Sequence, residues 1–242
     1  FGDSESSSIK SSIELDLKRK NSIKVALSFL NSTPNYNHLL FTSNYINYNW
    51  HNEFQNTKTK ALTLNFKSDK IINLDVDYIN IANHIQFEQI ETGSTDNIFT
   101  YAVKPIQHED IIDLLKVKLN RSISFGKFSI DSSLMFQKSI SNEIVNVPKI
   151  ISRNTIYFSS DLFKKALYLQ TGFGVKYFSK FYMNGYDPLL SELYIQRVKE
   201  IGDFPMIDFF VNAKIQQTRL YFKLEHLNSS LTGYNFYSAP NY

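Results

Sequence analysis

The stretch INLDVDY at residues 72–78 decides the fold class, because it alternates strictly between apolar and polar side chains. Its apolar side chains fall at 72, 74, 76 and 78, and its polar side chains fall at 73, 75 and 77. Successive side chains of a β-strand point to opposite faces of the sheet. The stretch therefore predicts a strand with one apolar face and one polar face.

The same alternation recurs along the chain, whereas helical spacing appears nowhere over a comparable length. It is present in 13–18, 23–29, 62–66, 115–120, 128–137, 167–177, 207–215 and 219–225. No break in composition marks a domain boundary. The sequence predicts an all-β fold, an antiparallel up-and-down meander of long hairpins that forms one domain over residues 1–242.

Composition limits the classes of protein that this chain can represent. The 242 residues carry a net charge of only +3, with scattered Lys and Arg, which argues against a nucleic-acid partner. The absence of cysteine excludes disulfides and thiolate metal sites. No apolar run reaches the roughly 18 to 20 residues that a membrane helix needs, but a barrel strand needs only about 9 to 11 residues with alternate apolar positions.

Three features favour a transmembrane β-barrel over a soluble β-sandwich. The expected strands at 47–67, 70–91 and 167–182 exceed the usual length of about 5 or 6 residues in globular proteins. Charged residues occupy mid-strand positions, as expected for a water-filled lumen. Aromatic residues gather near strand ends, as in the girdles of outer-membrane barrels. Aromatic residues that fill a sandwich core remain an alternative.

The connections alternate between tight turns and long polar segments. We expect the tight turns at 18–21, 68–70, 126–127, 164–165 and 216–218 on the periplasmic rim. The long segments 31–46, 92–110, 139–150 and 228–242 should lie on the opposite rim. Counting 189–197 as a spanning strand would break this order. We therefore predict that it belongs to an external excursion, and that strands 167–182 and 206–216 are direct neighbours.

Residues able to carry catalysis or bind a metal form no convincing site. His108, Glu109 and Asp110 are potential metal ligands, but a site needs three or four converging ligands, and a solvated loop is the expected reading. Asp75 and Asp77 resemble a general acid/base couple but are expected to line a lumen. No nucleophile elbow or dinucleotide fingerprint is present. We therefore expect no enzyme, no cofactor and no metal site.

Several stretches resemble the putative porin family of Bacteroidota outer-membrane proteins. The likeness is clearest in SRNTIYFSSDLFKKALYLQTG at 152–172, and continues in YDPLL at 186–190 and IGDFP at 201–205. It also covers FFVNAK at 209–214, EHLNS at 225–229 and SAPNY at 238–242. The resemblance implies a barrel in the bacterial outer membrane and, more weakly, a pore. Such barrels close with a final aromatic-rich strand after a segment like 239–242, so we expect a fragment that lacks this strand and the N-terminal strands.

These observations predict a channel for passive diffusion of small polar solutes, surrounded by outer-membrane lipid. The rival is a structural or accessory barrel with a plugged lumen, bound to other envelope proteins in secretion or gliding machinery. Seven apolar residues are expected to face lipid: Val25, Leu64, Val76, Val117, Phe173, Val211 and Phe222. The expected pore-lining residues are Lys24, Asp75, Asp77, Lys116, Lys118, Asp131, Lys176, Lys214, Lys223 and Glu225.

Overall fold

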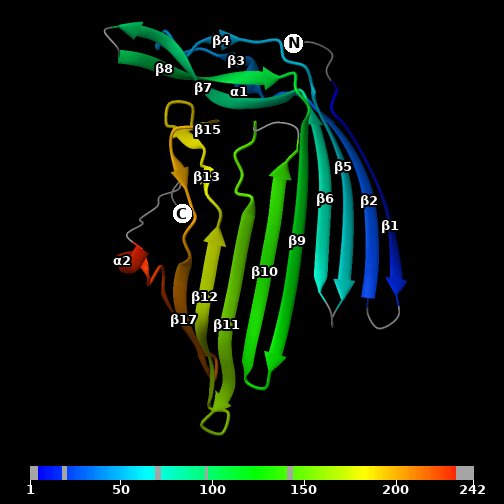
Figure 1. Cartoon of the computed structure of the whole chain (residues 1–242), viewed down its shortest axis with the longest axis vertical. Coiled ribbons are helices and arrows are strands. Elements are labelled where there is room, and N and C mark those ends of the chain that lie inside the picture. The colour runs from blue at the N-terminus through cyan, green and yellow to red at the C-terminus, as the bar shows by residue number, and fades with distance from the viewer. Residues whose placement is uncertain (1–4, 18–20, 69–71, 96–97, 141–143, 233–242) are drawn as a thin grey trace.

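A ten-stranded antiparallel sheet dominates the computed structural model, which describes residues 5–17, 21–68, 72–95, 98–140 and 144–232 (Figure 1). The all-β antiparallel prediction is confirmed. Within the described ranges, no helix has the length and apolarity needed to cross a membrane. The strands, in their order across the sheet, are β1 (Ser7–Leu17), β2 (Asn21–Ser32), β5 (Thr57–Ser68), β6 (Asn73–Ala82), β9 (Ile112–Phe125), β10 (Phe128–Ser139), β11 (Ile150–Leu162), β12 (Leu167–Phe178), β17 (Met206–Ile215) and β18 (Thr218–Leu224).

The register gives the sheet one apolar and one polar face. Directly paired residues project on the same side of the sheet, so a row of paired residues across many strands shows which side chains share a face. One such row, on β1, β2, β5, β6, β9 and β10, is Ile13, Val25, Leu64, Val76, Val117 and Phe136. The adjacent row on the first five of these strands is Glu14, Lys24, Asn65, Asp75 and Lys118. All seven residues expected to face lipid lie on the apolar face.

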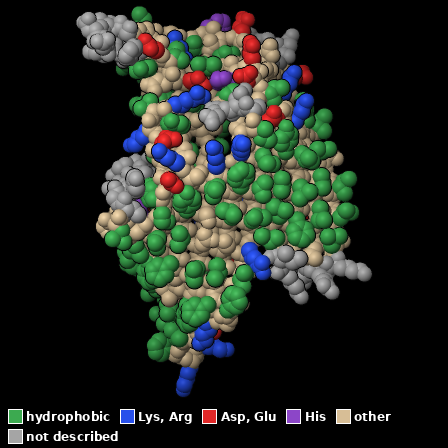
Figure 2. All heavy atoms as spheres, viewed as in Figure 1, with side chains coloured by type: hydrophobic (Ala, Val, Ile, Leu, Met, Phe, Trp, Pro, Cys, Tyr) green, Lys and Arg blue, Asp and Glu red, His purple; other side chains and the backbone are tan. Residues whose placement is uncertain are grey.

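The apolar face is the open one. Phe173 and Phe222 on this face are 50% and 54% exposed. Figure 2 shows hydrophobic side chains spread over the strands, with most of the charged side chains gathered above them. Several side chains on the polar face are buried instead: Ala26, Ser129, Gln137 and Asp208. Crowding of this kind identifies the polar face as the inner face of the curved sheet.

A small polar patch interrupts the apolar face near the middle of β9, β10 and β11. Arg121 pairs with Ser132, which pairs with Asn154. Ser132 Oγ donates a hydrogen bond to Asn154 Oδ1, and Asn154 Nδ2 donates to Ser152 Oγ at 2.8 Å. Arg121 is exposed. A guanidinium in this position is costly if the face meets lipid.

Tight turns occupy one rim and long connections the other, as predicted (Figure 1). The turns at 126–127, 163–166 and 216–217 use backbone with positive φ, at Gly126 (61°), Lys164 (57°) and Gln216 (53°) among others. β1, β2 and β5 meet on this rim at Leu17, Asn21 and Ser68. The predicted turn residues 18–20 and 69–70 lie outside the described ranges, as does 233–242 of the last long segment.

The segment 183–205 lies outside the ten-stranded sheet, as the alternating directions of neighbouring strands predict. β12 pairs directly with β17, from Leu167 with Ile215 to Lys176 with Met206. The excursion between them carries β13 (Phe181–Tyr182), β14 (Gly185–Asp187), β15 (Glu192–Ile195) and β16 (Glu200–Ile201). None of these four short strands pairs into the ten-stranded sheet. The prediction that 189–197 stays outside the wall is confirmed.

The predicted strand 70–91 and loop 92–110 are wrong. β6 ends at Ala82, and Asn83 has a φ of 57°, which turns the chain out of the sheet. β7 (His84–Thr95) and β8 (Ile98–His108) then form a separate hairpin. Alternation continues through the bend, so periodicity does not reveal that a strand has changed sheets.

The other long strands are shorter than predicted. The strand expected at 47–67 begins at Thr57, preceded by β4 (Trp50–His51), and the strand expected at 167–182 ends at Phe178. The expected loop 31–46 begins within β2 and contains α1 (Tyr36–Leu39) and β3 (Leu40–Phe41). Long connections therefore contain short elements that pair with one another outside the main sheet, such as β3 with β4.

Candidate functional site

The polar face brings together the residues expected to line a pore. Nine of the ten lie in strands, and the register places all nine on this face. The tenth, Glu225, follows β18 and forms an ion pair with Lys223. The polar face therefore carries basic and acidic groups side by side.

Charged side chains on β1 to β9 balance one another across neighbouring strands. Lys116 Nζ lies 3.9 Å from Asp77 Oδ2, and Thr63 Oγ1 donates to Asp77 Oδ1 at 2.8 Å. Asn65 Nδ2 donates to Asp75 Oδ1 at 2.8 Å. The two aspartates thus interact with separate partners on β5, as lining groups would, rather than with each other.

A second charged cluster centres on Asp208 of β17, which sequence reasoning did not select. Asp208 Oδ2 lies 2.7 Å from Lys176 Nζ and 3.2 Å from Lys223 Nζ. The backbone N–H of His226 donates to Asp208 Oδ1 at 3.0 Å. The carboxylate side chain is only 6% exposed, so two ammonium groups compensate a nearly buried charge. The alternation of apolar and polar residues within 207–215 could have identified Asp208, since it places this residue on the polar face.

The long connections fold into a second structure, which we call the cap: residues 33–56, 83–95, 98–111, 144–149 and 179–205. Strand β15 pairs in parallel with β7, Tyr194 with Phe87. Tyr48 Oη donates to Asp187 Oδ2 at 2.9 Å. Asn146 Nδ2 donates to Gln196 O at 2.9 Å. Hydrogen bonds thus join connections that leave the wall at different strands.

These bonds require the cap to reach over the polar face. β5 and β12 are five positions apart in the sheet order, which is about 24 Å along the wall at the usual strand spacing. The connection before β5 nevertheless bonds directly to the connection after β12, at Tyr48 and Asp187. Figure 1 shows β3, β4, β7, β8 and α1 lying across the upper ends of the strands. The cap therefore extends over the inner side of this rim.

A small apolar core holds the cap together. Phe87 is 4% exposed, and its ring lies 5.1 Å from the His38 ring and 6.2 Å from Trp50. Trp50 stacks on Phe41 at 4.9 Å. Ala102, Val103 and Ile144 of the cap are also buried, as is Ile112 at the start of β9. Most buried apolar side chains of the described residues lie here rather than on the strands of the wall.

Two histidines of the cap, His84 and His108, contact side chains of the neighbouring strand. His108 Nε2 lies 2.8 Å from Glu88 Oε1 on β7, and His84 is the direct cross-strand neighbour of His108. Burial, reinforced by His108, lowers the pKa of His84, and burial also lowers the pKa of His38. No group of three or more His, Asp or Glu able to hold a metal occurs in the described part of the chain.

Comparisons with known proteins agree with this architecture. The family described as "Putative porin" matches residues 1–242. No curated protein matches the chain. The crystal structure of the ferric enterobactin receptor PfeA in complex with BCV-L6 is similar in fold, with a TM-score of 0.61 and 11% sequence identity. That match covers 91% of this chain but only 35% of the receptor chain. Because the family match extends over the entire sequence, the chain belongs to the family of putative porins.

Proposed function

We propose that the protein is an outer-membrane channel through which small polar solutes diffuse passively, with the polar face of the sheet as its lining. The two-faced wall carries this proposal: an apolar face with one small polar patch on one side, and paired charges on the other. Strands such as β9, with 14 residues, exceed the about 9 to 11 that a tilted barrel strand needs to cross the hydrocarbon layer. Membership of a porin family supports a transport or structural role rather than catalysis.

Mixed charge on the lining favours broad selection by size. Lys116 faces Asp77, and Lys24 Nζ lies 3.9 Å from Glu14 Oε2, so neither sign dominates this part of the wall. A channel of this kind selects by lumen width and by local charge without a chemical step. Lipid of the outer membrane would cover the apolar face.

Single-channel recording tests the proposal. Full-length protein would be reconstituted in a planar lipid bilayer, with the same preparation unfolded by boiling as the control. We expect discrete conductance steps and weak discrimination between potassium and chloride. A folded protein that shifts in gel migration on boiling but never conducts would overturn the channel while leaving the barrel intact. A soluble monomer without detergent would overturn the membrane location.

The cap favours a second candidate, a structural barrel with a closed lumen that serves a larger envelope complex. Its connections bond to one another over the inner side of the rim. Replacing 84–108 by a short glycine–serine linker separates the candidates. An intact protein that is silent and a deletion variant that conducts would support a closed lumen, whereas equal conductance of both would contradict it.

A further inference from the structure

A groove crosses the apolar face of β1, β2, β5 and β6 near the capped rim, the rim from which the long connections extend. Its volume is about 560 Å³, within the range of roughly 300–1,000 Å³ that is usual for small-molecule sites. The lining includes one row of paired residues, which the register places on the apolar face: Ser11, Leu27, Leu62 and Tyr78. The groove therefore opens outward, away from the polar face.

The groove is apolar toward the middle of the wall and basic toward the capped rim. Leu27 and Leu62 are 60% and 45% exposed, and they lie two residues from the paired Val25 and Leu64. Lys60 lies two residues from Leu62 in the other direction, nearer the start of β5, and it is exposed. At the usual rise per residue, Lys60 and Leu64 are about 13 Å apart along the strand. Positive charge thus occupies one end of an otherwise largely apolar groove.

The ammonium of Lys60 is flanked by neutral residues. In the register, Lys60 pairs with Phe29 on β2 and with Asn80 on β6. Asp113, the acidic residue of the same row, is two strands away, or about 9.5 Å at the usual strand spacing. Its Oδ1 accepts hydrogen bonds from Tyr78 Oη at 2.7 Å and Asn80 Nδ2 at 2.8 Å. Within the described part of the chain Lys60 forms no ion pair, so its charge can attract a ligand.

Lys58 extends the positive charge toward the rim. It follows Lys60 at an interval of two residues on the same face of β5, and it is also exposed. Its directly paired neighbours are Asn31 and Ala82, which carry no charge. Two ammonium groups on one edge of an apolar surface are complementary to a ligand that has hydrocarbon at one end and negative charge at the other.

We propose that this groove binds a phosphate-bearing anionic lipid, with an acyl chain along Leu27 and Leu62 and the phosphate at Lys60. The acyl chain alone gives little selectivity, since lipid would cover the whole apolar face. The headgroup decides, because an ammonium near a lipid surface favours a net negative headgroup over a zwitterionic one. The inference rests on the membrane location that the proposed function includes, and it does not depend on whether the lumen conducts.

Native mass spectrometry of the full-length protein, released from an uncharged detergent, tests the site by counting bound lipid. The probes are phosphatidic acid and phosphatidylcholine with identical acyl chains. We expect the first phosphatidic acid to bind about fivefold more tightly than phosphatidylcholine, as one lysine near a headgroup predicts. Lys60→Gln should remove most of this preference. Glycerol 3-phosphate, which has the phosphate but no acyl chain, should not displace the lipid.

Matched variants separate the groove from a general attraction between charges. Lys138 also lies exposed on the apolar face, near the end of β10 and outside the groove, so Lys138→Gln should leave the preference unchanged. Ser11→Phe fills the groove with an apolar ring and should weaken the binding of both lipids about fivefold. Leu15→Phe, on the same face of β1 but outside the groove, should not weaken it. A change of gel migration on boiling, equal to that of the parent protein, confirms that each variant folds.

Equal affinity for the two lipids would overturn the inference. A preference that Lys60→Gln leaves unchanged, or that Lys138→Gln lowers equally, would also overturn it. Displacement of the lipid by glycerol 3-phosphate would identify a dissolved ligand and would refute the lipid as occupant. A protein that conducts but shows no lipid preference would overturn only this inference, whereas a silent protein that prefers phosphatidic acid would overturn only the channel.

Discussion

Lysine at Val117 should destabilise the protein far more than lysine a few residues away on the same strand. Val117 lies mid-way along β9 on the apolar face, paired with Val76 and Phe136. Its directly paired neighbours offer no carboxylate and no hydrogen-bonding side chain. A lysine on the lipid face near the bilayer midplane costs about 2 to 4 kcal/mol, which is roughly a 30-fold to 700-fold change in the folding equilibrium.

Ser122 provides the matched control on β9. It is exposed on the polar face and pairs with Asp131, so Ser122→Lys places the new ammonium opposite a carboxylate. We expect this change to alter the free energy of unfolding by less than about 1 kcal/mol. Equilibrium unfolding of both variants in urea, in lipid vesicles, gives the comparison. Equal losses at Val117 and Ser122, or a larger loss at Ser122, would refute the assignment of the two faces.

Three further predictions concern single side chains. Arg121→Leu removes a guanidinium from the apolar face and should raise the free energy of unfolding by about 2 kcal/mol in the same vesicle assay; a loss of stability would mean that Arg121 has a partner. Gly172→Ala should lower the unfolding midpoint, because its Cβ would lie 2.6 Å from Tyr157 Cα and would also meet Ile156 O, whereas Gly174→Ala should be tolerated with its nearest contact at 4.0 Å. Burial lowers the pKa of His84, so the folded cap binds fewer protons than the open cap, and its stability should fall as pH drops below about 6.5. Hydrogen exchange of β7 and β8, corrected for intrinsic rates, should therefore be faster at pH 5 than at pH 7.5, and His84→Phe should reduce this difference. His38, whose pKa burial also lowers, stays unchanged in the variant and contributes the remainder, and His108 and Glu88 face the same region.

The faces of the wall could be read from the sequence because each strand carries its own alternation. Asp75 and Asp77 on β6, for example, fall on the polar face through the period of two alone. The alternating directions of antiparallel strands also predicted that β12 lies beside β17, since only that pairing keeps the tight turns on one rim. Both inferences depend on local pattern and on the directions of neighbouring strands, which sequence specifies well.

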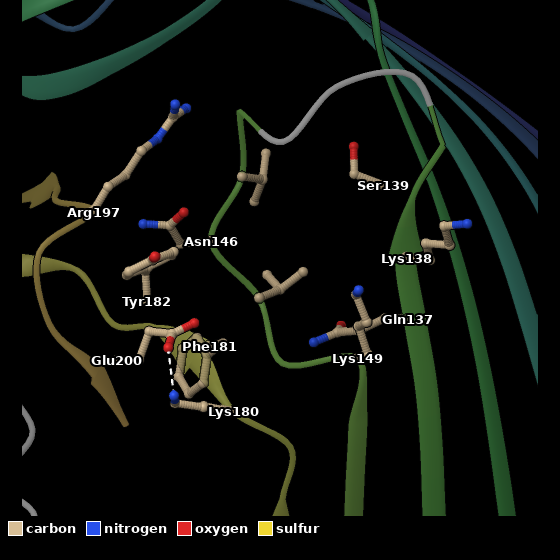
Figure 3. A pocket seen from close by; sticks show the side chains of 12 residues that line it. Gln137, Lys138, Ser139, Asn146, Lys149, Lys180, Phe181, Tyr182, Arg197 and Glu200 are labelled. Carbon is tan, nitrogen blue, oxygen red and sulfur yellow. Dashed lines mark ion pairs between the residues drawn. The ribbon is translucent and has the colours of Figure 1, made fainter. Parts of the chain in front are cut away.

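The cap could not be predicted in the same way. Its decisive contacts join Phe87 to Tyr194 and Tyr48 to Asp187, and no local period encodes such distant pairs. Alternation continued past Asn83, so the hairpin β7–β8 was read partly as wall and partly as loop. The cavity of about 300 Å³ at the capped rim (Figure 3) could not be predicted either, because residues of β10, of the β10–β11 connection and of the excursion after β12 line it together.

The parallel pairing of β7 with β15 has a consequence for the order of assembly. Phe87 precedes β9 in the chain, Tyr194 follows β12, and four strands of the wall lie between the two partners. A contact between segments that are distant in the chain costs conformational entropy, because the chain between them must close into a loop. Intervening strands that are already ordered reduce this cost. Each neighbouring hairpin of the wall can form locally, but this pair cannot. We therefore expect closure of the cap to be a late event in folding, which follows the pairing of the wall strands from β9 to β12.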